Sequence, residues 1–113
     1  MKSNFEVVFL EQALAFLESL DKKAQLKVIY NIDKAKLKTD PKLFKKLEDD
    51  IWEFRTVYAG LQYRILAFWD KTDNTETLVL ASHGFIKKVD KVPKKEIEKA
   101  KNIRTQYFEQ KKR

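Results

Sequence analysis

Hydrophobic and polar positions in the first third of the chain predict a strand followed by two helices. Residues 5–10 are rich in β-branched and aromatic side chains and predict a strand. Apolar residues then recur at spacings of three and four, as in an amphipathic helix, at Ala13, Phe16, Leu17 and Leu20. Asp21 suits the N-cap of a second helix, whose expected core residues are Leu26, Ile29, Ala35 and Leu37. Because the link between the helices is short, we expect an antiparallel helical hairpin.

The rest of the chain predicts mainly strands and one further helix. Asp40 and Pro41 are typical of a helix start and predict a short helical turn through Leu47. Strands are expected at residues 51–58, 61–69 and 75–85. Pro93 opens a last helix with one apolar face, formed by Ile97, Ala100, Ile103 and Tyr107. We therefore expect one α+β domain over residues 1–113, with an N-terminal strand, a helical hairpin, a three-stranded antiparallel meander and a C-terminal helix. The helices are expected mainly on one face of the sheet.

The composition removes several classes of site. The chain has no cysteine, which excludes disulfides, a thiol nucleophile and thiolate metal ligands. One histidine without a paired ligand spacing argues against a metal site, and no cofactor is expected. No apolar run reaches the length of a signal peptide or a membrane span. We expect a cytoplasmic protein with no membrane partner.

The positive charge is unevenly distributed along the chain. The formal net charge is +7, and eleven Lys or Arg against four Asp or Glu between Ile86 and Arg113 account for all of it. Residues 1–85 are neutral overall. Such concentration favours a docking surface for a polyanion, and the alternative is a solvated, lysine-rich terminal helix.

A two-residue loop, Ala59-Gly60, fixes an expected register between the second and third strands. Tyr58 then pairs with Leu61, and stepping outward places Arg55 directly opposite Arg64. Like charges across a strand pair are unfavourable, which points to an anion at this place. Glu53 lies on the same face and is expected to hold one guanidinium, or, in the alternative interpretation, to neutralise a surface network.

The end of the last strand collects residue types that suit RNA cleavage. Attack of a 2′-OH on the adjacent phosphate needs a base, an acid and positive charge. His83 titrates near neutrality, although a lone histidine is also typical of a core position. Arg55 and Arg64 would clamp the phosphate. Further candidates are the basic residues Lys87, Lys88 and Lys91 and, for stacking on a base, Tyr63 and Phe85.

Four segments in order resemble one protein family. They are residues 51–55 (IWEFR), 63–66 (YRIL), 78–88 (LVLASHGFIKK) and 93–100 (PKKEIEKA). This set is similar to the phage-derived, HigB-like branch of the RelE/ParE toxin superfamily, which has a RelE-like fold. The residue before His83 is apolar in that pattern and is Ser82 here.

The resemblance implies the toxin of a type II toxin–antitoxin system. Such toxins are ribosome-dependent mRNA endonucleases that need no metal, and a cognate antitoxin protein holds them inactive. By position, Arg55, Arg64, Lys87 and Lys88 match the basic residues of the family, and His83 matches its strand-end histidine.

Two other functions remain open. ParE-like relatives share the element order and inhibit DNA gyrase without cutting RNA. A basic nucleic-acid-binding protein without enzymatic activity would bind in a salt-dependent way and tolerate His83→Ala. The opposed arginines and the lysine pair favour the nuclease, because a gyrase inhibitor has no need of a phosphate clamp.

Overall fold

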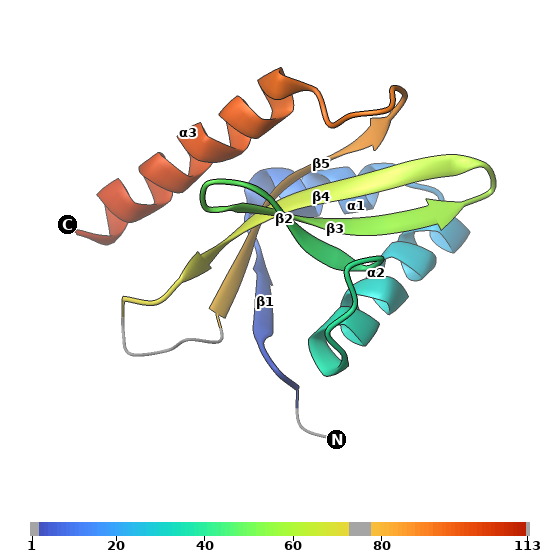
Figure 1. Ribbon diagram of the computed structural model, residues 1–113, viewed down its shortest axis with the longest axis horizontal. Coiled ribbons are helices and arrows are strands. Elements are labelled where there is room, and N and C mark those ends of the chain that lie inside the picture. The colour runs from blue at the N-terminus through green and yellow to red at the C-terminus, as the bar shows by residue number, and fades with distance from the viewer. Residues whose placement is uncertain (1–2, 73–77, 113) are drawn as a thin grey trace.

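The computed structural model describes residues 3–72 and 78–112, which form a five-stranded sheet with three helices (Figure 1). The elements are β1 (Glu6–Phe9), α1 (Glu11–Ser19), α2 (Lys22–Leu37), β2 (Phe44–Glu48), β3 (Ile51–Tyr58), β4 (Leu61–Asp70), β5 (Leu78–Lys87) and α3 (Lys94–Lys111). The strand order is β1-β5-β4-β3-β2. The fold is therefore α+β, as expected, but the sheet is larger than the three-stranded meander that the sequence predicts.

The sheet also departs from a purely antiparallel arrangement. Strands β2 to β5 pair antiparallel, whereas β1 runs parallel to β5 at the edge. The expected strand at residues 75–85 corresponds to β5, and its residues 75–77 lie outside the described residues.

Helices α1 and α2 cover one face of the sheet, α1 against β5 and α2 against β3. The Asp21 carboxylate caps α2 by accepting a hydrogen bond from the Ala24 amide at 2.9 Å, as predicted. The phase of α2 differs from the prediction, because Leu26 and Leu37 are exposed. Its buried residues are Ala24, Val28, Asn31, Ile32 and Ala35.

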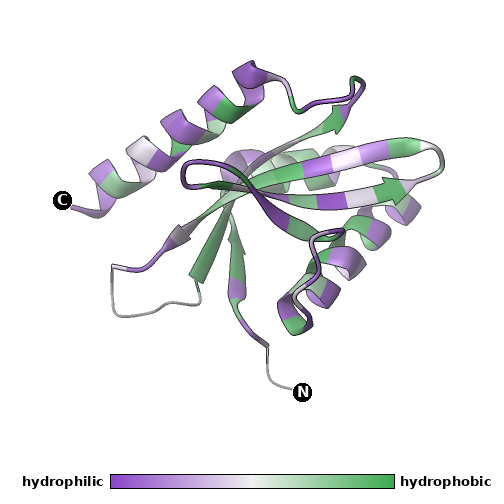
Figure 2. Cartoon of the chain, in the orientation of Figure 1, coloured by the Kyte–Doolittle hydropathy of each residue, from purple (hydrophilic) through white to green (hydrophobic). Residues whose placement is uncertain are grey.

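Helix α3 covers the opposite face, so two of the three helices lie on one face of the sheet and the expectation of helices mainly on one face holds for α1 and α2 but not for α3. Ile97 and Ala100 of α3 pack with Leu66 and Phe68 of β4, whereas the neighbouring Ile65 packs in the core under α1 and α2. Figure 2 shows that α3 is mainly hydrophilic with isolated hydrophobic positions, and these positions form its contact with the sheet. The apolar face predicted for this helix is confirmed at Ile97 and Ala100, which are buried.

The helical turn predicted from Pro41 through Leu47 is wrong beyond its first residues. Asp40 does cap a turn, since its Oδ1 atom accepts a hydrogen bond from the Lys42 amide at 2.9 Å. From Phe44 the chain enters β2, where the Phe44 ring stacks on Phe54 of β3 at 4.2 Å between centroids. Pairing with β3 thus determines the conformation of this segment.

No helix in the described part of the chain is long and apolar enough to cross a membrane.

Candidate functional site

The arginine pair lies where the two-residue hairpin loop was predicted to place it. Strands β3 and β4 pair in register from Tyr58 opposite Leu61 to Arg55 opposite Arg64, which confirms the predicted pairing. Ala59 and Gly60 both have positive φ angles, 52° and 79°, as a two-residue turn of this twist requires. The hairpin turn therefore determines that the two guanidinium groups share one face.

Glu53 and Arg64 form a buried ion pair on that face. Oε1 of Glu53 lies 3.0 Å from Nε of Arg64, and the two side chains are 3% and 2% exposed. Neither atom has a hydrogen-bond partner of good geometry among the described residues. The ion pair is therefore the main compensation for burying the two charges.

Other contacts hold the rest of the Arg64 guanidinium in place. Nη1 donates to the Tyr63 carbonyl at 3.1 Å, and Nη2 donates to Oε1 of Gln62 at 2.9 Å. Burial lowers the pKa of Arg64 and the charge of Arg55 lowers it further, while Glu53 opposes both effects. Arg64 is thus a fixed cation whose environment favours additional negative charge.

Arg55 is held more loosely and faces solvent. Its side chain is 31% exposed, and its Nε lies 4.0 Å from Oε2 of Glu53. Nη1 donates a long hydrogen bond of 3.4 Å to the Pro41 carbonyl. A hollow of about 330 Å³ opens beside it, with Lys42, Gln62 and Arg64 in its wall. This hollow gives an incoming anion access to the arginine pair.

Lys87 adds a third cation from the end of β5. It lies opposite Gln62 in the sheet, and its Nζ donates to the Asp90 carbonyl at 2.9 Å. Burial lowers the pKa of Lys87, and the nearby charges of Arg64 and Arg55 lower it further. We call Glu53, Arg55, Gln62, Arg64 and Lys87 the cationic site; it carries three positive charges and one negative charge.

His83 lies on the same sheet face but is closed off by α3. Its side chain is 2% exposed, and its Nε2 lies 3.0 Å from Oε1 of Glu96 in the first turn of α3. Burial lowers the pKa of His83, although the hydrogen bond to Glu96 opposes the shift. The imidazole reaches a substrate only if the first turn of α3 moves.

The predicted stacking residues occupy different environments. Tyr63 is 4% exposed in the core beneath α1 and α2, on the face opposite Arg64, so its ring is not available to stack on a base in this conformation. Phe85 is half-buried opposite Arg64, and its ring lies 6.0 Å from that of His83. Phe85 therefore remains next to the cationic site.

The remaining predicted lysines lie outside this cluster. Lys88 and Lys91 are exposed after β5, and no contact within residues 3–72 and 78–112 joins them to the arginine pair. Much of the basic charge of α3 is also already paired. Lys101 lies 2.9 Å from Asp49, Arg104 lies 3.5 Å from Asp50, and Lys111 lies 2.7 Å from Asp70.

Sequence reasoning missed three polar residues around the site. Gln62 is two residues from Arg64 on the same strand, so strand periodicity placed it on this face and was a usable signal. Glu96 gave no such signal, because its contact with His83 depends on how α3 packs. Lys42 was missed because its segment was assigned to a helix.

Within the described residues, no group of three His, Cys, Asp or Glu is placed to hold a metal ion.

A family model matches most of the chain. The family model described as "Phage derived protein Gp49-like (DUF891)", a family associated with toxin–antitoxin systems, matches residues 15–105. No curated protein matches the chain. The matched region extends from α1 to the second half of α3 and includes every residue of the cationic site. Since the match covers most of the sequence, the chain belongs to the phage-derived Gp49-like family.

Proposed function

We propose that this protein is the toxin of a type II toxin–antitoxin system, of the RelE/HigB type, and that it cleaves mRNA on the ribosome. Its partners in this proposal are the mRNA in the ribosome and a cognate antitoxin that blocks the cationic site. Membership of a family associated with toxin–antitoxin systems supports the general role. The observation that carries the nuclease proposal is the buried Glu53–Arg64 pair, which fixes one guanidinium beside the exposed Arg55.

The proposed reaction is transfer of a phosphodiester within the RNA. The 2′-oxygen forms a bond to phosphorus and gives its proton to a base, and the bond from phosphorus to the 5′-oxygen breaks. The departing oxygen takes a proton from an acid, leaving a 2′,3′-cyclic phosphate and a 5′-hydroxyl. The pentavalent phosphorane carries extra negative charge, so preorganised cations stabilise it more than the starting diester.

In the proposed reaction, this positive charge comes from side chains of the cationic site that differ in how freely they can move. Arg64 is fixed by three contacts, whereas Arg55 is free to close on a phosphate from the open side. Lys87 is charged, and its pKa is lowered by burial and by Arg64, which eases loss of its proton. We assign Lys87 the role of acid toward the 5′-oxygen. His83 acts as base only in a conformation in which Glu96 releases it.

The test is cleavage of mRNA in a purified translation system. We compare the wild-type protein with Arg55→Ala, and use Lys23→Ala, an exposed cation on α2, as the matched control for loss of one charge. We expect cleavage in ribosome-bound mRNA only, with cyclic phosphate ends. Arg55→Ala should lower the cleavage rate roughly 100-fold, as for removal of one donor to an oxyanion. Lys23→Ala should retain the wild-type rate.

Three results would contradict the proposal in different ways. Intact mRNA with continued translation excludes the nuclease, and a supercoiling assay in parallel then tests for a gyrase inhibitor. Equal cleavage by wild type and Arg55→Ala removes the arginine pair from the reaction. Cleavage of naked mRNA at the same rate excludes dependence on the ribosome.

A further inference from the structure

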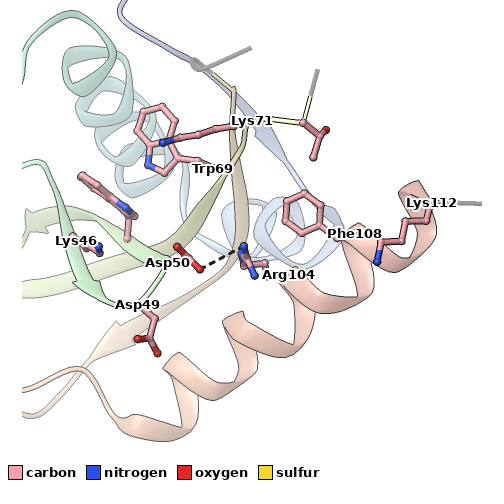
Figure 3. A pocket seen from close by; sticks show the side chains of 10 residues that line it. Lys46, Asp49, Asp50, Trp69, Lys71, Arg104, Phe108 and Lys112 are labelled. Atoms are coloured by element: carbon pink, nitrogen blue, oxygen red, sulfur yellow. Dashed lines mark ion pairs between the residues drawn. The ribbon is translucent and has the colours of Figure 1, made fainter. Parts of the chain in front are cut away.

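We propose that a second hollow, at the other end of β4, binds a nucleotide of single-stranded RNA through its base and its phosphate. The hollow measures about 930 Å³ and lies between the β2–β3 turn, the end of β4 and the second half of α3 (Figure 3). Trp52 and Trp69 line it from the sheet face that α1 and α2 cover, and Phe108 lines it from the face that α3 covers. Lys46, Lys71 and Arg104 are among its basic residues. This inference concerns a site separate from the cationic site and does not depend on cleavage.

The aromatic wall offers rings that the core does not fully use. Trp52 and Trp69 meet edge to face, with centroids 5.9 Å apart, and both are half-buried. Phe108 approaches from α3 and is also half-buried. Partly exposed aromatic faces beside a cavity are the platforms on which unpaired bases stack.

Cations lie directly beside these rings. The ammonium of Lys71 is 5.8 Å from the centroid of the Trp69 ring, and the guanidinium of Arg104 is 5.0 Å from that of Phe108. Figure 3 shows Lys71 extended along Trp69 and Lys112 beside Phe108 on α3. Alternation of rings and positive charge matches the alternation of base and phosphate in a single strand.

The acidic residues of the wall cancel only part of this charge. Asp50 pairs with Arg104 at 3.5 Å, and Asp49 pairs with Lys101 at 2.9 Å. By contrast, Lys46 and Lys71 form no ion pair with any carboxylate in the part of the chain that the structure describes. Two exposed ammonium groups are therefore available for phosphate oxygens.

The position of the hollow separates it from the cationic site. Trp69 follows Arg64 by five residues on β4, which corresponds to about 16 Å along an extended strand. A substitution in one site is consequently not expected to change contacts in the other. Arg55→Ala thus tests the proposed function, and substitutions of Lys46 and Lys71 test the nucleotide pocket.

Intrinsic fluorescence reports on this pocket directly, because the chain contains only two tryptophans and both line it. We titrate the protein with a single-stranded RNA of about six nucleotides and, separately, with AMP. Both should change the tryptophan fluorescence if the pocket recognises base and phosphate. Saturation by AMP at the affinity of the RNA identifies a free mononucleotide as a sufficient ligand, whereas much weaker binding of AMP identifies the strand.

The decisive variant is Lys46→Ala/Lys71→Ala, compared with Lys22→Ala/Lys23→Ala, which removes two exposed charges from α2. We expect the first variant to bind RNA about tenfold more weakly, with a salt dependence smaller by roughly 1.4 in logarithmic slope, for two lost phosphate contacts. The control should bind as wild type does. An unchanged fluorescence with both ligands, or equal binding by the two lysine variants, would overturn the proposal.

Discussion

Replacing Glu53 by glutamine tests whether the buried ion pair of the cationic site compensates a buried charge. Glu53 contributes the only carboxylate that contacts Arg55 or Arg64 within the described residues. The substitution keeps the shape of the side chain and removes its charge, so Arg64, which is 2% exposed, loses its compensating partner. Breaking a buried pair by removing one partner costs about 3–5 kcal/mol. Because a glutamine oxygen keeps a partial negative charge beside Arg64, we expect the lower end of this range, about 3 kcal/mol, or a melting temperature lower by about 12 °C.

Urea unfolding followed by circular dichroism measures this loss, with the slope against urea concentration as a check that the unfolded state is unchanged. Glu109→Gln, on the exposed side of α3, is the matched control and should change stability by less than about 0.5 kcal/mol. The substitution at Glu53 also raises the net charge of the cationic site by one unit. Inorganic phosphate at constant ionic strength should therefore stabilise Glu53→Gln more than wild type.

Two results would refute this reasoning at different steps. A loss for Glu53→Gln as small as that for Glu109→Gln would show that the pair does not compensate the burial of Arg64. A large loss with no additional stabilisation by phosphate would show that the arginines form a structural network without an anion site.

Two further predictions concern the contacts of α3. Burial would raise the pKa of Asp70, but hydrogen bonds from Lys111 and Tyr107 outweigh it and hold that pKa well below its usual value. The contribution of Asp70 to stability is therefore present above about pH 4 and is lost as the pH falls through the lowered pKa. Asp70→Asn should lower the free energy of unfolding by about 2 kcal/mol at pH 7 and weaken its decrease at acid pH. An unchanged decrease at acid pH would contradict this. Because burial lowers the pKa of His83, the contribution of this residue to stability should be complete above about pH 7 and should decline as the pH falls below about 6.5. An NMR titration of this single histidine should give a pKa below about 6.5. A higher value would show that the effect of Glu96 on the pKa is larger than that of burial.

The β3–β4 hairpin was predictable in detail because its determinants are local. A two-residue link with glycine at its second position allows only a tight turn, and the turn fixes the register of both strands. The opposition of Arg55 and Arg64 follows from that register alone. Sequence therefore predicts the centre of the cationic site.

Strand β2 was not predictable in this way because its conformation depends on a distant partner. Pro41 and the lysines that follow it suit a helix start, and a turn does form at Asp40. The strand is stabilised by pairing with β3 and by the stack of Phe44 between Phe54 and Trp52. Such long-range contacts override local preference.

The covering of both sheet faces had a local signal that the prediction did not use. Residues 63–68 of β4 are all buried, and the sequence within them contains the uninterrupted apolar run 65–68. A strand buried on both faces has such a run, whereas a half-exposed strand alternates. The sequence gives no comparable signal for which side of α2 faces the sheet. The buried side of this helix includes the polar residue Asn31, whose burial is explained by its hydrogen bond to Thr56 on β3.

The position of each strand in the sheet accounts for the different states of the two arginines. Strand β4 is central, so Arg64 is buried between neighbouring strands and bound by Glu53 and Gln62. Strand β3 pairs with the short edge strand β2, and the Arg55 amide donates to the Leu43 carbonyl at 2.8 Å, but the Arg55 side chain is 31% exposed. A fixed cation stabilises developing charge without reorganisation, and a mobile one can close behind an entering phosphate. Arg55→Lys keeps the positive charge but loses the planar guanidinium with its two parallel donors. This variant should therefore still bind a phosphate but should no longer hold it in one orientation.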